Sequence, residues 1–193
     1  MPRSFRIAQR SDFSRLELSD MHQLRARIFS GRMGWDVPVI SDIEIDEFDF
    51  LDPYYMMING PDDYLCGCWR LLPTNGPYML RKVFPELLHG HPVPEHPKVW
   101  ELSRFAISTD TSGKYGFTGL AMEAMREIVA FGDRMGIERY VTVTTVAIER
   151  MLRHANIAIK RFGPPLQVGA QKVVALEIDL GEVTRMALFE RQA

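Results

Sequence analysis

One short run of the sequence, Trp100-Glu-Leu-Ser-Arg-Phe105, carries two ions, Glu101 and Arg104, among mostly apolar residues. The residues around it favour a buried strand, where an ion costs several kcal/mol unless a partner compensates. Side chains alternate between the faces of a strand, so an unbroken strand would direct Glu101 and Arg104 to opposite faces. A β-bulge between them would turn both toward one cleft, and bulges are frequent beside active sites. Two simpler interpretations stay open: the two ions pair with each other, or the strand is an edge with one solvated face.

A second group of ionisable residues lies in an acidic segment, where carboxylates alternate with apolar residues from Asp42 to Asp49. An EF-hand calcium loop needs glycine at its sixth position and glutamate at its twelfth, and this segment has Glu47 and Pro53 there. Residues 36–63 contain neither lysine nor arginine. The segment is therefore either a solvated surface or a set of carboxylates neutralised by cations from other elements.

The cations nearest to this segment in the predicted fold come from three separate elements. They are Arg25, Arg70 and Arg104. We expect these arginines to neutralise Asp46 and Asp49, because a buried carboxylate needs an opposite charge close by.

The elements that must hold these residues are predicted from hydrophobic periodicity. A helix begins with a capping box, Ser14 to Glu17, and ends near residues 31–34. Two more helices are expected at 120–135 and 148–155, where apolar residues recur every three or four positions, and short ones at 85–89 and near the C-terminus. Strands are expected at about 5–8, 54–59, 64–72, 99–108, 140–146 and 173–179. This order favours one α/β domain over residues 1–193, with a mixed sheet and helices on both faces.

Composition limits the class of protein. The chain has 193 residues, of which 46% are hydrophobic and 25% charged, as in a globular domain with a sizeable core. The net charge of -2 gives no basic field for nucleic acid. No apolar run is long enough for a signal peptide or a membrane helix, so we expect a cytosolic (cytoplasmic) protein. Cys66 and Cys68 are too few for a zinc site and indicate core packing, so no metal is expected.

Four segments, taken together, resemble the LuxI-type acyl-homoserine lactone synthases, the autoinducer synthases of quorum sensing. They are Leu24-Arg-Ala-Arg-Ile-Phe29 with Gly34-Trp-Asp36, Glu44-Ile-Asp-Glu-Phe-Asp49, Gly67-Cys-Trp-Arg-Leu-Leu72, and the run from Trp100 to Phe105. Three further runs, at 76–80, 84–88 and 141–145, resemble the LasI branch of that family. The joint order and spacing of these segments span nearly the whole chain, which makes the resemblance specific.

The resemblance implies a GNAT-like acyltransferase fold, in which a mixed twisted sheet is splayed at its centre and helices lie on both faces. The splay is expected between the strands at 99–108 and 140–146, where a pantetheine arm would lie as an added strand does. The N-terminal part, to about residue 50, would be a mobile segment that covers the substrate. Residues 112–116 match the GNAT pyrophosphate loop only in part, which favours acyl carrier protein over coenzyme A as the donor.

The implied reaction has two steps. The amine of S-adenosylmethionine, a co-substrate, attacks the thioester of a fatty acyl group, and the substrate carboxylate then attacks its own γ-carbon and expels methylthioadenosine. Glu101 is expected to act as the base, with Ser103 and Arg104 as further catalytic candidates. The backbone N–H groups of Phe105 and Ala106 are expected to stabilise the oxyanion.

Binding of S-adenosylmethionine is assigned by resemblance and by chemistry. Arg25 suits the substrate carboxylate, while Phe29 and Trp35 suit the adenine or the sulfonium through stacking and cation–π contact. Phe84 matches another position of the family, as a core residue or as a contact. The charged cluster of the family, which holds the N-terminal part over the cleft, corresponds here to Asp46, Asp49, Arg70 and Arg104.

The acyl chain is expected to lie among mostly apolar side chains, for each of which plain core packing is the alternative. They are Met79, Leu102, Met125, Thr142, Thr144, Ile148, Leu152 and Ala155. In the family, threonine at the position of Thr144 accompanies 3-oxo chains, whose extra carbonyl accepts its hydroxyl hydrogen bond. We therefore expect a medium or long 3-oxo-acyl chain. The acidic carrier protein would bind a late basic cluster, unless that cluster is a solvated helix face: Arg150, Arg153, Lys160 and Arg161.

Two other functions remain open on the sequence alone. One is a GNAT-type N-acetyltransferase that uses acetyl-coenzyme A on another amine. The other is a non-catalytic sensor that binds acyl chains. The partial glycine-rich loop at residues 112–116 and the wide apolar face of the helix at 120–135 weigh against the first, and the retained ions weigh against the second.

Overall fold

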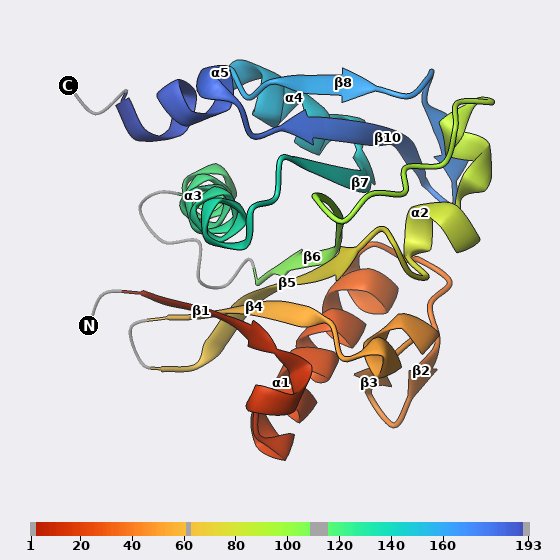
Figure 1. The fold of residues 1–193 in the computed structure, drawn as a ribbon. Coiled ribbons are helices and arrows are strands. Elements are labelled where there is room, and N and C mark those ends of the chain that lie inside the picture. The colour runs from red at the N-terminus through yellow and green to blue at the C-terminus, as the bar shows by residue number, and fades with distance from the viewer. Residues whose placement is uncertain (1–2, 61–62, 109–115, 191–193) are drawn as a thin grey trace. The chain divides into compact units, whose positions relative to one another are not determined.

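The computed structural model describes residues 3–60, 63–108 and 116–190 of the chain (Figure 1). The chain divides into two compact units, of which the first comprises residues 1–71 and 104–120 and the second residues 72–103 and 121–193. Strand β6 (Val99–Ile107) contributes its beginning to the second unit and its end to the first. The expected single domain, with a mobile segment before about residue 50, stays a prediction.

The sheet of the first unit is antiparallel. β1 (Ser4–Gln9) pairs with β4 (Tyr54–Asn59) in an unbroken register from Ser4–Asn59 to Gln9–Tyr54. β4 pairs in turn with β5 (Leu65–Pro73), and the register shifts once, beside Ile58. The end of β6 lies next to β5, because Ser108 N donates to Cys66 O at 2.8 Å. The predicted hairpin of β4 and β5 is confirmed.

One long helix covers the core of the first unit. α1 (Arg15–Ala26) begins with the predicted capping box, in which Glu17 N donates to the Ser14 hydroxyl and Ser14 N to the Glu17 carboxylate. It continues into the π-helical turn η2 (Arg27–Arg32), close to the predicted end. The buried residues of α1 and η2 form one core with the strands: Met21, Leu24, Ile28 and Phe29 with Tyr55, Met57, Cys68 and Ala106.

Short elements connect η2 to β4. β2 (Val39–Ile40) and β3 (Ile43–Glu44) form a separate two-stranded sheet, and η3 (Glu47–Leu51) is a single 3-10 turn. Asp46 caps η3, because its carboxylate accepts the N–H of Phe48 at 3.0 Å, a role that aspartate favours. The sequence analysis predicted none of these three elements.

In the second unit the first part of β6 pairs parallel with β7 (Arg139–Thr145), from Val99–Arg139 to Leu102–Thr142. The register between β6 and β7 ends at the pair Leu102–Thr142, although β7 continues to Thr145. The sequence analysis expected the splay between these two strands. β7 also pairs antiparallel with β10 (Gln171–Asp179). Two short strands pair antiparallel with β10 as well, namely β8 (Ile159–Arg161) and β9 (Leu166–Val168).

Helices complete the second unit. α3 (Gly116–Met135), which belongs to this unit from residue 121 onward, lies close to β7, since Tyr140 Oη donates to Ile128 O at 3.0 Å. A Cβ at Gly132 would lie 2.7 Å from Leu180 Cδ1, so a larger residue there would require the Leu180 side chain to shift. The other helical segments are α4 (Val146–His154), α2 (Met79–Lys82), η4 (Pro85–Leu88), α5 (Glu182–Arg185) and η7 (Met186–Glu190).

The long elements expected from the sequence are confirmed within one or two residues at most ends. α2, β8 and β9 were not predicted. The partial pyrophosphate loop at 112–116 lies outside the described residues. Among the helices that the structure describes, none has the length and apolar character needed to cross a membrane.

Candidate active site

The main concentration of buried charge lies in the first unit, where three arginines meet three carboxylates. We call this set the ionic cluster, and it consists of Arg25, Glu44, Asp46, Asp49, Arg70 and Arg104. The members come from α1, β3, η3 with its cap, β5 and β6. Four of the six have no exposed surface, so each depends on its partners for compensation.

Arg25 is held from two sides. Its Nη1 and Nη2 donate to Oδ1 and Oδ2 of Asp49 at 2.8 and 2.9 Å, a bidentate pair, and its Nε donates to Glu44. Burial alone would lower the pKa of Arg25, but the two carboxylates raise it well above its ordinary value. Each nitrogen of Arg25 is therefore engaged within the cluster. This arrangement gives Arg25 a scaffolding role, and its contact with a substrate carboxylate stays a prediction.

Asp49 is the centre of the cluster. Besides Arg25 it accepts Arg70 Nη1 at 2.8 Å, Tyr55 Oη at 2.5 Å and Asp46 N at 2.8 Å. Burial raises the pKa of Asp49, but the opposing effect of Arg25 and Arg70 is larger and holds it far below its usual range. The two arginines thus favour the ionised form of Asp49, and the four donors hold it in place as a structural ion.

Arg104 joins the cluster from a strained backbone position. Its φ of +57° lies in the left-handed region, which costs a non-glycine residue about 1–3 kcal/mol. Its Nε donates to Glu44 Oε1 at 3.1 Å and its Nη2 to Asp46 Oδ2 at 2.9 Å. The backbone of β6 is thus irregular at Arg104, and a bulge between Glu101 and Arg104 stays a prediction. The joint orientation of Glu101 and Arg104 stays a prediction.

An aromatic stack extends from the ionic cluster. The rings of Phe29 and Trp35 are nearly parallel, at 16°, with centroids 5.6 Å apart. Arg104 Cζ lies 5.5 Å from the Phe29 centroid, which is cation–π distance. The Trp35 indole N–H is enclosed and has no hydrogen-bond partner among the described residues. The stack shows that the Phe29 ring accepts both a flat ring and a cation.

The two residues predicted to form the oxyanion hole also lie in the first unit. The Phe105 ring packs against Trp69, with centroids 4.3 Å apart, and Ala106 is buried in the core beneath α1. Both occupy β6 directly after the strained Arg104. The role of their N–H groups stays a prediction.

Glu101, in the second unit, has partners that the sequence did not indicate. It is almost fully buried, and its Oε2 and Oε1 accept the N–H groups of Met79 and Leu80 at 3.0 and 2.7 Å. The carboxylate therefore caps the first turn of α2, an arrangement that stabilises the anion. Ser103 is buried on the same strand, and Phe84 lies half-buried between α2 and η4.

The residues predicted to line the acyl pocket all lie in the second unit. Four are buried, namely Met79, Leu102, Met125 and Leu152, and three are partly buried, namely Thr144, Ile148 and Ala155. Thr142 is buried and its hydroxyl donates to Leu102 O at 2.7 Å, so it ties β7 to β6. Of the two threonines, Thr144 is therefore the better candidate for contact with an acyl chain.

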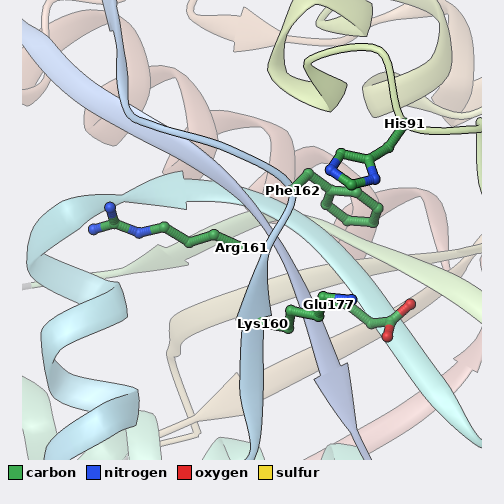
Figure 2. Close-up of a pocket in the computed structure, with 5 residues that line it drawn as sticks. All are labelled: His91, Lys160, Arg161, Phe162 and Glu177. Atoms are coloured by element: carbon green, nitrogen blue, oxygen red, sulfur yellow. The ribbon is translucent and has the colours of Figure 1, made fainter.

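The late basic cluster is partly neutralised from within. Arg153 and Arg161 both donate to Glu149, a carboxylate on α4 that is 1% exposed. A hydrogen bond from Arg161 is the main cause that lowers the pKa of Glu149. Figure 2 shows the Arg161 guanidinium turned away from a small pocket, which is lined by His91, Lys160, Arg161, Phe162 and Glu177. None of the predicted catalytic residues lines this pocket.

Two residues of the site escaped the sequence analysis as site residues. Glu44 is fully buried between Arg25 and Arg104, although it stands in the acidic run that the analysis described. His22 lies three residues before Arg25 on α1 and bonds to the Glu44 backbone. That helical spacing was the one signal that could have found it. In the part of the chain that the structure describes, no three His, Cys, Asp or Glu residues are arranged to hold a metal ion.

Comparison with known proteins places this geometry in a family. The family model for autoinducer synthase matches residues 9–188. An acyl-homoserine-lactone synthase of Pseudomonas aeruginosa is 47% identical over 185 residues, which cover 95% of this chain and 92% of the relative. The crystal structure of the synthase LasI superposes with a TM-score of 0.93 at 46% identity, over 97% of this chain and 95% of that one.

Other solved structures extend the comparison. TofI in a ternary complex with an inhibitor and MTA has a TM-score of 0.81 at 32% identity, over 97% of this chain and 96% of TofI. Two structures below 25% identity share the fold alone. BjaI, a coenzyme A-dependent synthase solved with SAM and isopentyl-CoA, has a TM-score of 0.86 at 23% identity, over 98% and 89% of the two chains. A putative N-acetyltransferase from Lactobacillus plantarum has 0.62 at 14% identity, over 92% and 99%.

These findings confirm the predicted GNAT-like acyltransferase fold and the predicted enzyme class. The matched residues include the whole ionic cluster and the aromatic stack. The chain belongs to the autoinducer synthase family.

Proposed function

We propose that this chain transfers a fatty acyl group from acyl carrier protein to the amine of S-adenosylmethionine and releases an acyl-homoserine lactone. The observation that supports this most is the stack of Arg104, Phe29 and Trp35 beside a balanced ionic cluster. S-adenosylmethionine offers a flat adenine and a sulfonium cation, the two kinds of group that the Phe29 ring accepts here. TofI with MTA and BjaI with SAM are relatives solved with this molecule or its product.

The first step forms an amide. A base must remove a proton from the substrate ammonium before the amine attacks the thioester carbonyl, and Glu101 is proposed as this base. Each carboxylate oxygen of Glu101 accepts one backbone N–H from α2. The α2 backbone thus holds the Glu101 carboxylate in a fixed position. The tetrahedral oxyanion is stabilised by the N–H groups of Phe105 and Ala106, and the thiol leaves with a proton.

The second step closes the lactone. A carboxylate oxygen of the acylated substrate attacks the γ-carbon, and the bond from that carbon to sulfur breaks. The sulfonium leaves as neutral methylthioadenosine, so no further proton is needed. Because the leaving group is already activated, the protein contributes mainly by positioning the chain for ring closure. The aromatic stack, which holds the adenosyl end, is proposed to fix that geometry.

The donor is proposed to be acyl carrier protein. Two members of the late basic cluster, Arg150 and Lys160, lie outside the salt bridges to Glu149 and would meet the acidic carrier. The acyl chain is proposed to be medium or long with a 3-oxo group near Thr144. Coenzyme A is the competing donor, because BjaI, which shares the fold, is a coenzyme A-dependent synthase.

Purified protein tests all parts of the proposal. It is incubated with S-adenosylmethionine and either acyl carrier protein or coenzyme A thioesters of different length, with and without a 3-oxo group. Mass spectrometry then quantifies the lactone and methylthioadenosine. We expect both products in equal amounts and higher kcat/KM with the carrier protein.

The outcomes separate the alternatives. If no donor yielded methylthioadenosine, the proposed synthase activity would be refuted. Product from acetyl-coenzyme A and a generic amine, without S-adenosylmethionine, would indicate an N-acetyltransferase. Glu101→Gln is expected to lose at least about a hundredfold in kcat, the usual contribution of a general base. An unchanged kcat would remove Glu101 from that role.

A further inference from the structure

His22 is a buried titratable residue that the proposed mechanism does not use. It lies on the inner face of α1, where 5% of its surface is exposed. Its Nδ1 is 2.8 Å from the backbone oxygen of Glu44. A carbonyl oxygen only accepts, so Nδ1 must carry the hydrogen. Nε2 then has a lone pair, and it is enclosed without a partner among the residues that the structure describes.

The contact matters because β3 has little support of its own. The sheet of β2 and β3 has two residue pairs, Val39–Glu44 and Ile40–Ile43, and both residues of β2 are exposed. A two-stranded sheet of this size is not stable by itself. The His22 bond is an uncharged tie from α1 to the backbone of β3. The Glu44 side chain meanwhile joins Arg25 of α1 and Arg104 of β6.

We propose that His22 is a positioning residue, which as the neutral Nδ1–H tautomer fixes the Glu44 backbone and so sets the Glu44 carboxylate between Arg25 and Arg104, and whose protonation at Nε2 destabilises the first unit by adding an uncompensated cation to it. The effect on catalysis rests on the proposed function. The effect on the first unit does not. Arg104 also lies over the Phe29 ring, so displacement of Glu44 would disturb the aromatic stack through Arg104.

The charges around His22 explain why the proton is disruptive. Arg25 approaches from α1, Glu44 from β3 and Asp49 from η3. Both carboxylates are already compensated, Asp49 by Arg25 and Arg70, and Glu44 by Arg25 and Arg104. Asp46, the remaining acid, is bound to Arg70 and Arg104. An imidazolium would therefore be an excess cation at a buried position.

The expected dependence on pH has a definite sign. Burial first, and the Arg25 charge second, hold the pKa of His22 below its ordinary value. The unfolded chain thus takes up this proton at about pH 6.5, before the folded chain does. The free energy of unfolding therefore decreases as the pH falls below about 6.5, until the folded pKa is passed.

Two substitutions separate the hydrogen bond from the titration. His22→Asn keeps an N–H donor near the position of Nδ1 and cannot titrate, whereas His22→Leu loses the donor. His154→Asn is the matched control, because Nδ1 of His154 also contacts a backbone oxygen, that of Arg150 at 2.7 Å, but on an exposed surface. Urea unfolding between pH 5 and 8 and hydrogen exchange of residues 43–49 are measured for each, together with KM for S-adenosylmethionine.

We expect His22→Asn to remove the decrease in stability between pH 6.5 and 5 and to keep protection of residues 43–49. His22→Leu should lose that protection and raise KM about tenfold, the effect of one missing buried hydrogen bond. His154→Asn should behave as the unchanged chain. A pH dependence retained in His22→Asn, or protection retained in His22→Leu, would refute the proposal. If the exchange results hold and no variant or unchanged chain makes lactone, the proposed function fails and the positioning role stands.

Discussion

The two units of this chain reach their stability by different means. The first gathers six ions from five short or distant elements, and its centre is Asp49 with its four donors. The second relies on apolar side chains from long elements, such as Ile128 and Val129 of α3 and Val174 of β10. An ionic centre depends on every partner being present, while an apolar core tolerates substitution of similar volume. The first unit therefore tolerates fewer substitutions than the second, and a single substitution destabilises it more easily.

The largest decrease in the free energy of unfolding is expected from Asp49→Asn. The substitution keeps the shape and removes the charge that Arg25 and Arg70 share. It is expected to reduce the free energy of unfolding by about 3–5 kcal/mol, the cost of breaking a buried ion pair. Urea unfolding at neutral pH measures it.

The matched control lies on the surface of the second unit. Arg81 and Glu95 form a pair in which both side chains are exposed. Arg81→Met should change the free energy of unfolding by less than about 1 kcal/mol. If Asp49→Asn cost no more than this control, the ionic cluster would contribute nothing to the stability of the first unit.

A smaller and more variable decrease in the free energy of unfolding is expected from substitutions in the apolar core of the second unit. Leu152 is 3% exposed, so Leu152→Ala should cost about 2–5 kcal/mol through lost contacts and a cavity. If the residue also lines the acyl pocket, the variant should prefer longer acyl chains, which mass spectrometry of the lactones shows. Leu152→Met, of similar volume, should cost less than about 1.5 kcal/mol. Equal losses for both would mean that this core is as intolerant as the ionic cluster.

The two units should also respond differently to acid. The folded pKa of Asp49 is depressed, so its contribution is complete above the unfolded value of about 4 and is lost as the pH falls below it. Hydrogen exchange, corrected for the intrinsic rate, should therefore show loss of protection in α1 and β5 before β7 and β10 as the pH falls from 4.5 to 2.5. Simultaneous loss in both units would contradict the comparison.

The smallest effect is expected from Thr144→Val. If the Thr144 hydroxyl binds the 3-oxo group as proposed, its loss should reduce the preference for 3-oxo over unsubstituted chains about fivefold, as expected for one hydrogen bond. Thr142→Val should leave that preference unchanged and lower stability, because the Thr142 hydroxyl bonds to Leu102 O. Ratios of kcat/KM for paired substrates test this. If the preference changed only in the Thr142 variant, Thr142 rather than Thr144 would be the residue that contacts the acyl chain.

The sequence predicted well where an element is long enough to show its own period. α3 and β10 carry apolar residues at their characteristic spacing and needed no other information. α2 did not, because it has four residues and its first turn is held by Glu101, more than twenty positions away. β3 likewise has two residues and is fixed by contacts with α1.

The candidate site follows the same division. The pairing of Asp46 and Asp49 with distant arginines was predicted, because carboxylates without local cations need partners from elsewhere. The hydrogen bond from His22 to a backbone oxygen was not predicted, because a backbone acceptor has no signature in the sequence. The positive φ of Arg104 was equally invisible in its residue type, since arginine rarely adopts it.

The charges of the ionic cluster sum to zero, and this has a consequence for how the chain can vary. Any single replacement that alters one charge leaves an odd charge enclosed, so neutral drift through such an intermediate is blocked. Exchanges at these six positions are therefore expected to occur in compensating pairs, one cation with one anion, or not at all. A library randomised at Arg70 and Asp46 together should yield folded chains that neither position randomised alone provides.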